Sequence, residues 1–362
     1  MSAGVRSWIG HIALPMVNLA AALVVSGLLI AMLGANPFHV LALLINGAFG
    51  GSEVIGYTLY YTTSFIFTGL AVAIAFHAGL FNIGAEGQAY IGGLGVGLLA
   101  LAADSLPFLI LLPLSIAASA AFGAGWALGP AWLQARRGSH IVITTIMFNF
   151  IASALMTYLL VNVLIKPGQQ SPETREFAAS AWLPFMHDFA FWMGIEFGKS
   201  PLNLSFAWAL ICCGAFWFYV WHTRWGYSLR ALGLNEDAAV YGGVSPARTI
   251  IVAMAISGAL AGFVSLNEIL GFQHRLMLNF TGGAGFVGIA VALMGRNHPV
   301  GIVLAALLFG ALYQGGSEVS FEMPKLNRDM IVAIQGFIIL MCGAFENVFR
   351  RPIEALLRPR AA

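Results

Sequence analysis

Charged side chains are scarce in this sequence, because Asp, Glu, Lys and Arg make up only 9% of its 362 residues. A typical soluble domain contains about 25% charged residues. Hydrophobic residues reach 59%, and the mean hydropathy is +0.85. This composition excludes an ordinary soluble domain and indicates an all-α polytopic membrane protein. The net charge of +2, carried by scattered basic residues, also excludes nucleic acid as a partner.

Cysteine is rarer still, with three residues, Cys212, Cys213 and Cys342, all inside apolar segments. We therefore predict neither a disulfide framework nor a metal site with recognisable ligand spacing. The sequence also lacks paired catalytic groups, two histidines spaced by three residues, and a nucleophile with an evident base. A membrane-embedded enzyme is accordingly the function with the least support, and we expect no catalytic residue.

Apolar segments of about 20 residues, the length that crosses a bilayer, occur about ten times within one transmembrane domain over residues 1–362. The eighth segment is short and rich in glycine, which is typical of a broken or re-entrant helix. Residues 36–55 are expected to form a loop with a short interfacial helix over His39–Ile45. The predicted spans are residues 12–34, 56–76, 82–103, 108–133, 141–165, 203–222, 250–270, 281–295, 299–317 and 329–349.

Lysine and arginine are distributed unevenly between the two sides of these spans. If the N-terminus is cytoplasmic, 11 of the 17 basic residues lie on the inner side and six on the outer side. This bias satisfies the positive-inside rule. We therefore expect cytoplasmic N and C termini, a cytoplasmic loop over residues 223–248 and a long outer loop over residues 166–202.

The outer loop interleaves aromatic residues and prolines, among them Trp182, Pro184, Trp192 and Pro201, with charged side chains. Such a loop is suited to docking an external partner. It is equally typical of an ordered loop that caps the helices and holds its aromatic rings at the level of the lipid headgroups.

The segment Phe81–Gln88 sets a carboxylate and two amides at the start of an apolar span. A charge near the bilayer centre costs roughly 2.5 to 3.5 kcal/mol on insertion scales, so an acid at depth normally faces a protein interior or a water-filled path. Amides and a carboxylate exchange hydrogen bonds with hydroxyl-rich or heterocyclic solutes. We therefore predict a translocation pathway that involves Asn82, Glu86, Gln88 and Asn149.

Structural roles also account for these residues. Glu86 is suited to bonding backbone amides at a helix start, and Asn149 to an interhelical hydrogen bond worth about 0.6 kcal/mol. Glu268, the other acid inside a span, lies near the outer end of its helix and is expected to reach the headgroup region.

Asn82–Gly87 resembles Asn279–Gly285, and each segment opens a glycine-rich span. The two spans are five helices apart, and this odd offset would make them run in opposite directions, as in an inverted repeat. Glycine-rich segments also resemble one another by chance, so both explanations stand.

Within the cytoplasmic loop, Asn235 is a suitable N-cap for a short helix that begins with Glu236 and Asp237. Their negative charges suit the positive end of a helix dipole, and Gly242 is a natural stop. A partner that held this helix would pull on the spans at 203–222 and 250–270 together. A solvated connector is the alternative interpretation of the same loop.

A family resemblance is carried by four motifs spread over nearly the whole chain: Phe81–Gln88, Thr145–Phe150, Gly233–Gly242 and Gly285–Gly301. With them the chain resembles the permease subunits of ABC importers for ribose, branched-chain amino acids and related solutes. The resemblance is strongest to the nucleoside and simple-sugar subgroup, which works with a Bmp-type binding lipoprotein.

This resemblance implies a multi-pass permease in the plasma (inner) membrane of a bacterium. It would pair with a second permease subunit and receive a nucleoside or simple sugar from an external solute-binding protein. ATP would be used by a cytoplasmic ATP-binding subunit, and this chain, which has no ATP-binding motif, would hold no cofactor. The residues that match the ATPase-contacting segment are Asn235, Glu236, Asp237, Ala238, Ala239, Tyr241 and Gly242.

A proton-coupled secondary transporter of a small polar solute is the alternative function, with Glu86 and Glu268 as proton carriers. This alternative needs no partner at the Asn235 helix. The two functions therefore differ in whether the isolated chain transports its solute.

Overall fold

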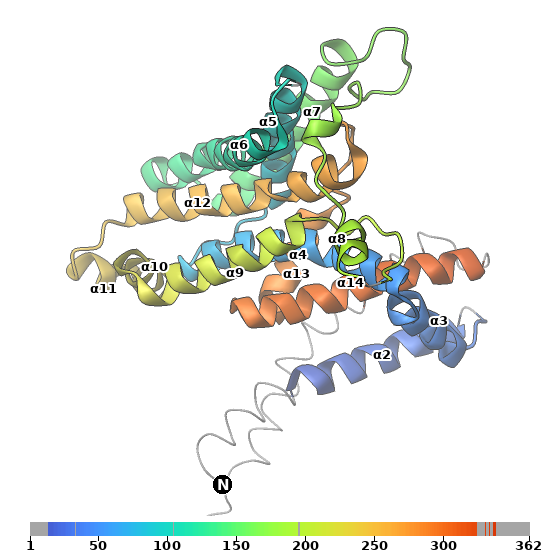
Figure 1. Ribbon diagram of the computed structural model, residues 1–362. Helices are drawn as coiled ribbons and strands as arrows, with labels where there is room; N and C mark the ends of the chain where they lie inside the picture. The colour runs from blue at the N-terminus through green and yellow to red at the C-terminus, as the bar shows by residue number, and fades with distance from the viewer. Residues whose placement is uncertain are drawn as a thin grey trace, which may run out of the picture. The chain divides into compact units, whose positions relative to one another are not determined.

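A computed structural model describes residues 14–32, 34–103, 105–194, 196–323, 330, 333, 336 and 337. These residues form helices without a β-strand (Figure 1), and two isolated backbone bridges join Glu173 to Met277 and Phe185 to Asn203. The expected all-α architecture is confirmed. Both termini, Cys342 and, apart from four single positions, the predicted span at 329–349 lie outside the described residues.

Contacts divide the chain into two units, one of residues 1–58 with 311–362 and one of residues 59–310. The smaller unit holds α2 and α3, and α4 and α14 each begin in one unit and end in the other. In chain order the elements are α2 (Leu14–Met32), α3 (Pro37–Phe49), α4 (Ser52–His77), α5 (Ala85–Ala102), α6 (Phe108–Arg137), α7 (Ile141–Asn162), η2 (Ala179–Ala181), α8 (Met186–Trp192), α9 (Ser205–His222), α10 (Arg224–Leu234), α11 (Glu236–Tyr241), α12 (Pro246–Gly262), η3 (Leu266–Gln273), α13 (Ala284–Met294) and α14 (Pro299–Glu322).

Six of the described segments are long and apolar enough to cross a membrane. They coincide with six predicted spans. An apolar segment in lipid must satisfy its backbone hydrogen bonds within itself, and a helix does so. The predicted spans at 12–34, 82–103 and 281–295 correspond to α2, α5 and α13. The total of ten membrane crossings stays a prediction. The six segments are Ser52–His77, Phe108–Arg137, Ile141–Asn162, Ser205–His222, Pro246–Gln273 and Pro299–Glu322.

The core of the larger unit is the contact among α5, α6 and α12, which run together in Figure 1. Their backbones touch through glycine. A Cβ atom added to Gly123 would lie 2.2 Å from the carbonyl oxygen of Gly258, and one added to Gly92 would lie 2.5 Å from the Cα of Gly262. Small residues permit this close approach, and dispersion between the backbones then holds membrane helices together.

The predicted span at 250–270 is not one regular helix. Helix α12 ends at Gly262, and the chain continues as the π-helix η3 over Leu266–Gln273. The wider turn lets the adjacent residues Asn267 and Glu268 both reach buried hydrogen-bond partners. Helices α10 and α11 adjoin the beginning of α12, and η3 lies at its other end (Figure 1).

Helix α13 is a half-length helix. Its 11 residues extend about 16 Å at 1.5 Å per residue, against a hydrocarbon core of about 30 Å. It begins after Gly282 and Gly283, whose φ angles of 54° and 82° place them in the left-handed region that glycine adopts freely. Within the short glycine-rich span at 281–295, the helix runs from Ala284 to Met294.

In the smaller unit, α3 is longer than the predicted helix over His39–Ile45. The Asn36 side chain accepts hydrogen bonds from the amides of Phe38 and His39, and Pro37 occupies the first turn. An asparagine cap followed by proline is a strong signal for the start of a helix. The first residues of a helix have no partner for their backbone N–H groups within the helix, so a proline there, which lacks an N–H, loses no hydrogen bond. The chain therefore enters the helix two residues earlier than predicted.

Candidate functional site

The predicted pathway residues Asn82 and Gln88 lie in direct contact. The Asn82 side-chain nitrogen donates to the Gln88 side-chain oxygen at 3.0 Å and to the Ser257 hydroxyl at 2.8 Å. Its oxygen accepts from the Gly84 amide at 2.8 Å, which shapes the turn into α5. Asn82 and Gln88 are both buried, so the two amides satisfy each other inside the larger unit.

Asn149 on α7 holds the backbone of the same segment. Its side-chain oxygen accepts from the Gly87 amide at 2.9 Å, and its nitrogen donates to the Ile83 carbonyl at 2.9 Å. A Cβ atom added to Gly87 would lie 2.7 Å from the Asn149 oxygen. The interhelical hydrogen bond expected of Asn149 is therefore present, and its proposed place in a pathway stays a prediction.

Glu86 is directed at the start of α13. Its carboxylate accepts from the Gly285 amide at 2.8 Å, from the Gly283 amide at 3.1 Å and from the Thr281 hydroxyl. This is the amide-bonding role that the sequence offered as an alternative to a pathway role. Whether solute also meets this carboxylate stays a prediction.

The beginnings of α5 and α13 adjoin at this point. A Cβ atom added to Gly285 would lie 2.3 Å from the Glu86 nitrogen. Each helix N-terminus carries a partial positive charge, so two adjoining N-termini repel unless an anion lies between them. The Glu86 carboxylate is that anion. The two resembling segments, Asn82–Gly87 and Asn279–Gly285, are thus in contact, while the inverted repeat itself stays a prediction.

The Asn82–Gln88 segment lies well inside the span of α12. Ser257, which bonds Asn82 and donates to the Ala71 carbonyl at 2.5 Å, follows Pro246 by 11 positions. Counted from residue 250, where the predicted span begins, Ser257 lies about 10 Å along the helix at 1.5 Å per residue, inside a 30 Å hydrocarbon core. Polar side chains at this depth are expensive and usually functional.

A second buried polar cluster, the Asn267 network, joins α4, η3 and the start of α9. Asn267 donates to the Ser64 hydroxyl at 2.8 Å and accepts from Asn203 at 3.1 Å and from the Ser205 hydroxyl at 2.8 Å. Glu268 accepts from Ser64 at 2.8 Å. Sequence reasoning missed this network, although adjacent Asn267 and Glu268 in an apolar span were a signal for it.

The position expected for Glu268 is wrong. Its side chain does not extend toward a headgroup region but is only 8% exposed. Besides Ser64, the Tyr60 hydroxyl donates to it. Tyr60 precedes Glu268 by 208 positions, so a reading of the span alone could not have identified this partner.

The short helix predicted in the 223–248 loop is confirmed as α11, Glu236–Tyr241. The Asn235 side chain accepts from the Ala238 amide at 2.9 Å, and Gly242 follows the last turn. Large apolar side chains at this end are exposed, with Tyr241 at 96% and Leu234 at 88%. Exposed apolar groups beside charged ones mark surfaces that bind partners.

A contact links this end to the polar segment. Gly233, near the end of α10, lies against the turn after α4, since a Cβ atom added to it would lie 2.3 Å from the His77 carbonyl oxygen and 2.9 Å from the Gly79 nitrogen. That turn leads directly to Asn82. A polar cavity of about 240 Å³ opens beside it, and Asn235 and Glu236 contribute to its lining.

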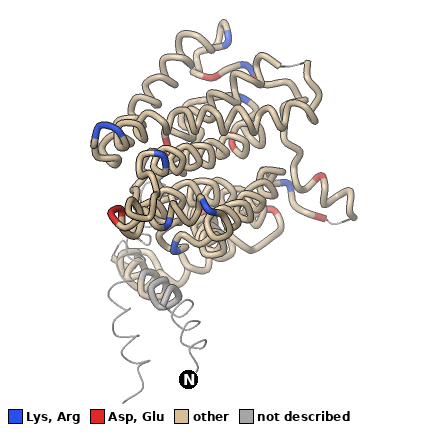
Figure 2. The backbone as a smooth tube through the Cα atoms, turned by 90° about the vertical axis from the view of Figure 1, so that its left-hand side faces the viewer, with Lys and Arg blue, Asp and Glu red and all other residues tan. Residues whose placement is uncertain are grey.

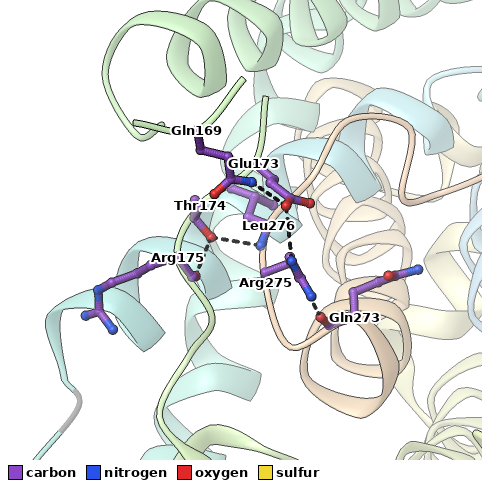
Figure 3. Close-up of polar contacts among 7 residues, drawn as sticks. All are labelled: Gln169, Glu173, Thr174, Arg175, Gln273, Arg275 and Leu276. Atoms are coloured by element: carbon purple, nitrogen blue, oxygen red, sulfur yellow. Dashed lines mark hydrogen bonds and ion pairs between the residues drawn. The ribbon is translucent and has the colours of Figure 1, made fainter. Parts of the chain in front are cut away.

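The long loop at the opposite end is ordered by backbone pairing with the residues after η3. The Thr174 amide donates to the Leu276 carbonyl at 3.0 Å, and the Leu276 amide donates to the Thr174 hydroxyl at 3.1 Å. Arg275 bonds the Glu173 carboxylate at 3.1 Å, and Gln169 donates to the same oxygen (Figure 3). An ordered capping loop is therefore present, while docking of an external partner stays a prediction.

Charged residues are sparse along the described backbone (Figure 2). Among the described residues no group of three or more His, Cys, Asp or Glu side chains could hold a metal ion. In the described part of the chain, six segments long and apolar enough to cross a membrane, together with a buried polar segment, are typical of a multi-pass membrane protein of the transport class.

The chain belongs to the family described as branched-chain amino acid transport system / permease component, whose model matches residues 54–342. It is similar to the guanosine ABC transporter permease protein NupP of Bacillus subtilis (strain 168), with 36% identity over 90% of this chain and 92% of the relative. The nucleoside ABC transporter permease protein NupB of Lactococcus lactis is 33% identical over 90% of this chain and 89% of its own length. The glucose ABC transporter permease protein TsgB13 of Haloferax volcanii is 33% identical over 93% of this chain and 88% of its own length.

These matches confirm the family resemblance carried by the four sequence motifs. The protein is a multi-pass permease of the bacterial plasma membrane. Permeases of this family are the membrane subunits of ABC transporters and work with ATP-binding and substrate-binding partners.

Proposed function

We propose that this permease imports a nucleoside or a simple sugar. An external binding protein delivers the solute, a second permease subunit completes the path, and a cytoplasmic ATP-binding subunit supplies the energy. The solute class is supported by the guanosine, nucleoside and glucose permeases to which the chain is similar.

Helix α11 carries the coupling part of the proposal. It is capped by Asn235, exposes Tyr241 almost completely and shows Glu236 and Asp237 at its start. The apolar ring of a tyrosine that is 96% exposed gains stabilisation when a partner covers it. The ATP-binding subunit is the partner that a permease of this family requires on its cytoplasmic side.

Motion of α11 would reach the polar segment through the contact of Gly233 with the turn after α4. That turn is close-packed against α10, and a close-packed contact transmits displacement instead of absorbing it. The Asn82–Gln88 pair and the Glu86 contact with α13 would then exchange their internal hydrogen bonds for bonds to solute. Asn149, which holds Gly87 and Ile83, would follow the same segment.

Co-purification with the ATP-binding subunit tests the coupling part. Tyr241→Ala should lower the amount of ATP-binding subunit retained by the tagged permease at least tenfold, because truncating a tyrosine that is a hot spot of an interface costs about 2 kcal/mol or more. Phe191→Ala is the matched control, since Phe191 is also an exposed aromatic, at 83%, but lies on α8. Equal retention by the wild type and Tyr241→Ala would contradict the proposal.

A further inference from the structure

A second cavity lies on the α11 side of the larger unit and is separate from the polar segment. Its volume is about 640 Å³, and it opens among the last turn of α9, the start of α10 and the start of α12. Tyr219 and Val252 line it from the two apolar helices, and Arg224 and Arg248 line it from the helix starts. Cavities of about 300 to 1,000 Å³ hold small organic ligands.

The cavity carries positive charge that nothing in the described chain neutralises. Arg224 and Arg248 are both exposed, and neither guanidinium has an ion-pair or hydrogen-bond partner among the described residues. No acidic residue lines the cavity. Two unpaired guanidinium groups at one cavity form a site for a phosphate or carboxylate, which each group can bind with two parallel hydrogen bonds.

The placement of the two arginines strengthens this assignment. Arg224 is the first residue of α10, and Arg248 lies in the first turn of α12. Cations are unfavourable at these positions, because the N-terminus of a helix already carries partial positive charge. The unfavourable charges and the two helix dipoles would all be relieved by one anion in the cavity.

The depth of the cavity indicates a lipid. It lies where two membrane-spanning segments meet the predicted cytoplasmic loop, and Trp225 and Tyr227 stand exposed at its rim. Tryptophan and tyrosine gather at the headgroup level of a bilayer, and basic pockets on the cytoplasmic side bind anionic headgroups. We propose that this cavity binds a phosphate group, and that the phosphate belongs to an anionic phospholipid of the inner leaflet.

Lipid retention by the purified full-length chain tests the proposal. Native mass spectrometry in a detergent with equal amounts of phosphatidylglycerol and phosphatidylcholine should show phosphatidylglycerol retained on the wild type. The double variant Arg224→Gln and Arg248→Gln should lower that retention at least tenfold, since it removes both positive charges that attract the anionic headgroup. The control variant Arg136→Gln and Arg137→Gln, at the end of α6, should retain the lipid. Elution on size exclusion checks folding, and the two single variants replace the double variant if it aggregates.

Four results would overturn the proposal or its lipid part. Equal retention of the two lipids, or an unchanged preference in the double variant, would show that the cavity is not an anionic-lipid site. Displacement of phosphatidylglycerol by millimolar inorganic phosphate would assign the site to a free phosphate and overturn the lipid assignment. Unchanged lipid retention with lost co-purification of the ATP-binding subunit would show that the arginines bind that protein instead.

Discussion

The Glu86 carboxylate accepts a 2.8 Å hydrogen bond from the amide of Gly285, and thereby joins the first turn of α5 to the first turn of α13. Two helix N-termini meet at this bond, so the carboxylate neutralises two partial positive charges at once. The bond also connects the segment that holds Asn82 and Gln88 to a helix that spans only half of a bilayer. Any rearrangement that displaces α13 must break or replace it.

Replacing Glu86 by Gln should lower the melting temperature of the purified permease. The single oxygen of the new side-chain amide can still accept from Gly283. Its NH₂ group would then face the backbone N–H of Gly285, and two donors cannot form a hydrogen bond with each other. Leaving such a buried group unsatisfied costs about 1 to 3 kcal/mol. Glu176→Gln, an exposed change in the outer loop, should leave the melting temperature unchanged.

The same variant separates the two roles considered for Glu86. Solute uptake is measured per inserted molecule. A fall at equal insertion supports a role in the pathway, whereas uptake that only follows the amount of folded protein supports a purely structural role.

Replacing Asn149 by Ala should destabilise the protein by about 1 to 2 kcal/mol, because the Gly87 amide and the Ile83 carbonyl would lose their partner. Asn162→Ala on the same helix is the control, since Asn162 is exposed and donates only to the Tyr158 carbonyl within α7. Denaturation followed by circular dichroism compares the two. Equal loss in both variants would show that the interhelical bonds contribute little.

Replacing Gly233 by Ala should interrupt the contact that links α10 to the turn after α4. The new Cβ would lie 2.3 Å from the His77 carbonyl oxygen, so one of the two backbones must move. We expect uptake to fall at least tenfold while the ATP-binding subunit still co-purifies, because the change leaves α11 intact. Gly214→Ala on α9, where a Cβ meets nothing within 4 Å, should retain uptake. Normal uptake by Gly233→Ala would exclude this contact as the route of coupling.

The outer loop should loosen in acid. Burial lowers the pKa of His274, with Arg275 acting in the same direction, while a backbone hydrogen bond at Leu270 and the Glu176 carboxylate oppose the shift. His274 therefore binds a proton at higher pH in the unfolded state than in the folded state. The His274 contribution to stability is therefore complete above about pH 6.5 and is lost as the pH falls below that value.

Limited proteolysis of the outer loop between pH 7.5 and pH 5.5 measures this effect. His274 stacks on Trp182 with ring centroids 4.1 Å apart, so protonation should release the loop and speed its cleavage. His274→Asn keeps a residue that tolerates the φ of 53° but does not titrate in this range. Its cleavage rate should not change over the same interval, and a parallel acceleration would assign the effect to other groups.

Much of this fold is predictable from local signals in the sequence. Hydropathy identifies the six long segments because lipid requires apolar residues over a bilayer's thickness. The cap at Asn235 and the stop at Gly242 predict α11, since both act within one helical turn. Proximity of Asn82 and Gln88 follows in the same way from six positions of separation.

The remaining features depend on partners that are distant in the sequence. Glu268 is buried because Tyr60 and Ser64, more than 200 positions earlier, supply its hydrogen bonds. The π-helix over Leu266–Gln273 accompanies these contacts and has no local sequence signal of its own. Glu86 bonds backbone amides at the start of a helix, as one of its two interpretations predicted. The helix is α13, however, and its Gly285 amide lies 199 positions from Glu86 in the sequence.

Transport by the purified chain in sealed vesicles tests the central claim most directly. The permease is reconstituted alone and with its ATP-binding subunit and partner permease, and nucleoside accumulation is followed with external binding protein and internal ATP present. We expect accumulation only in the complete assembly and none with the isolated chain under a proton gradient. Proton-driven accumulation by the isolated chain would contradict the account and identify a secondary transporter.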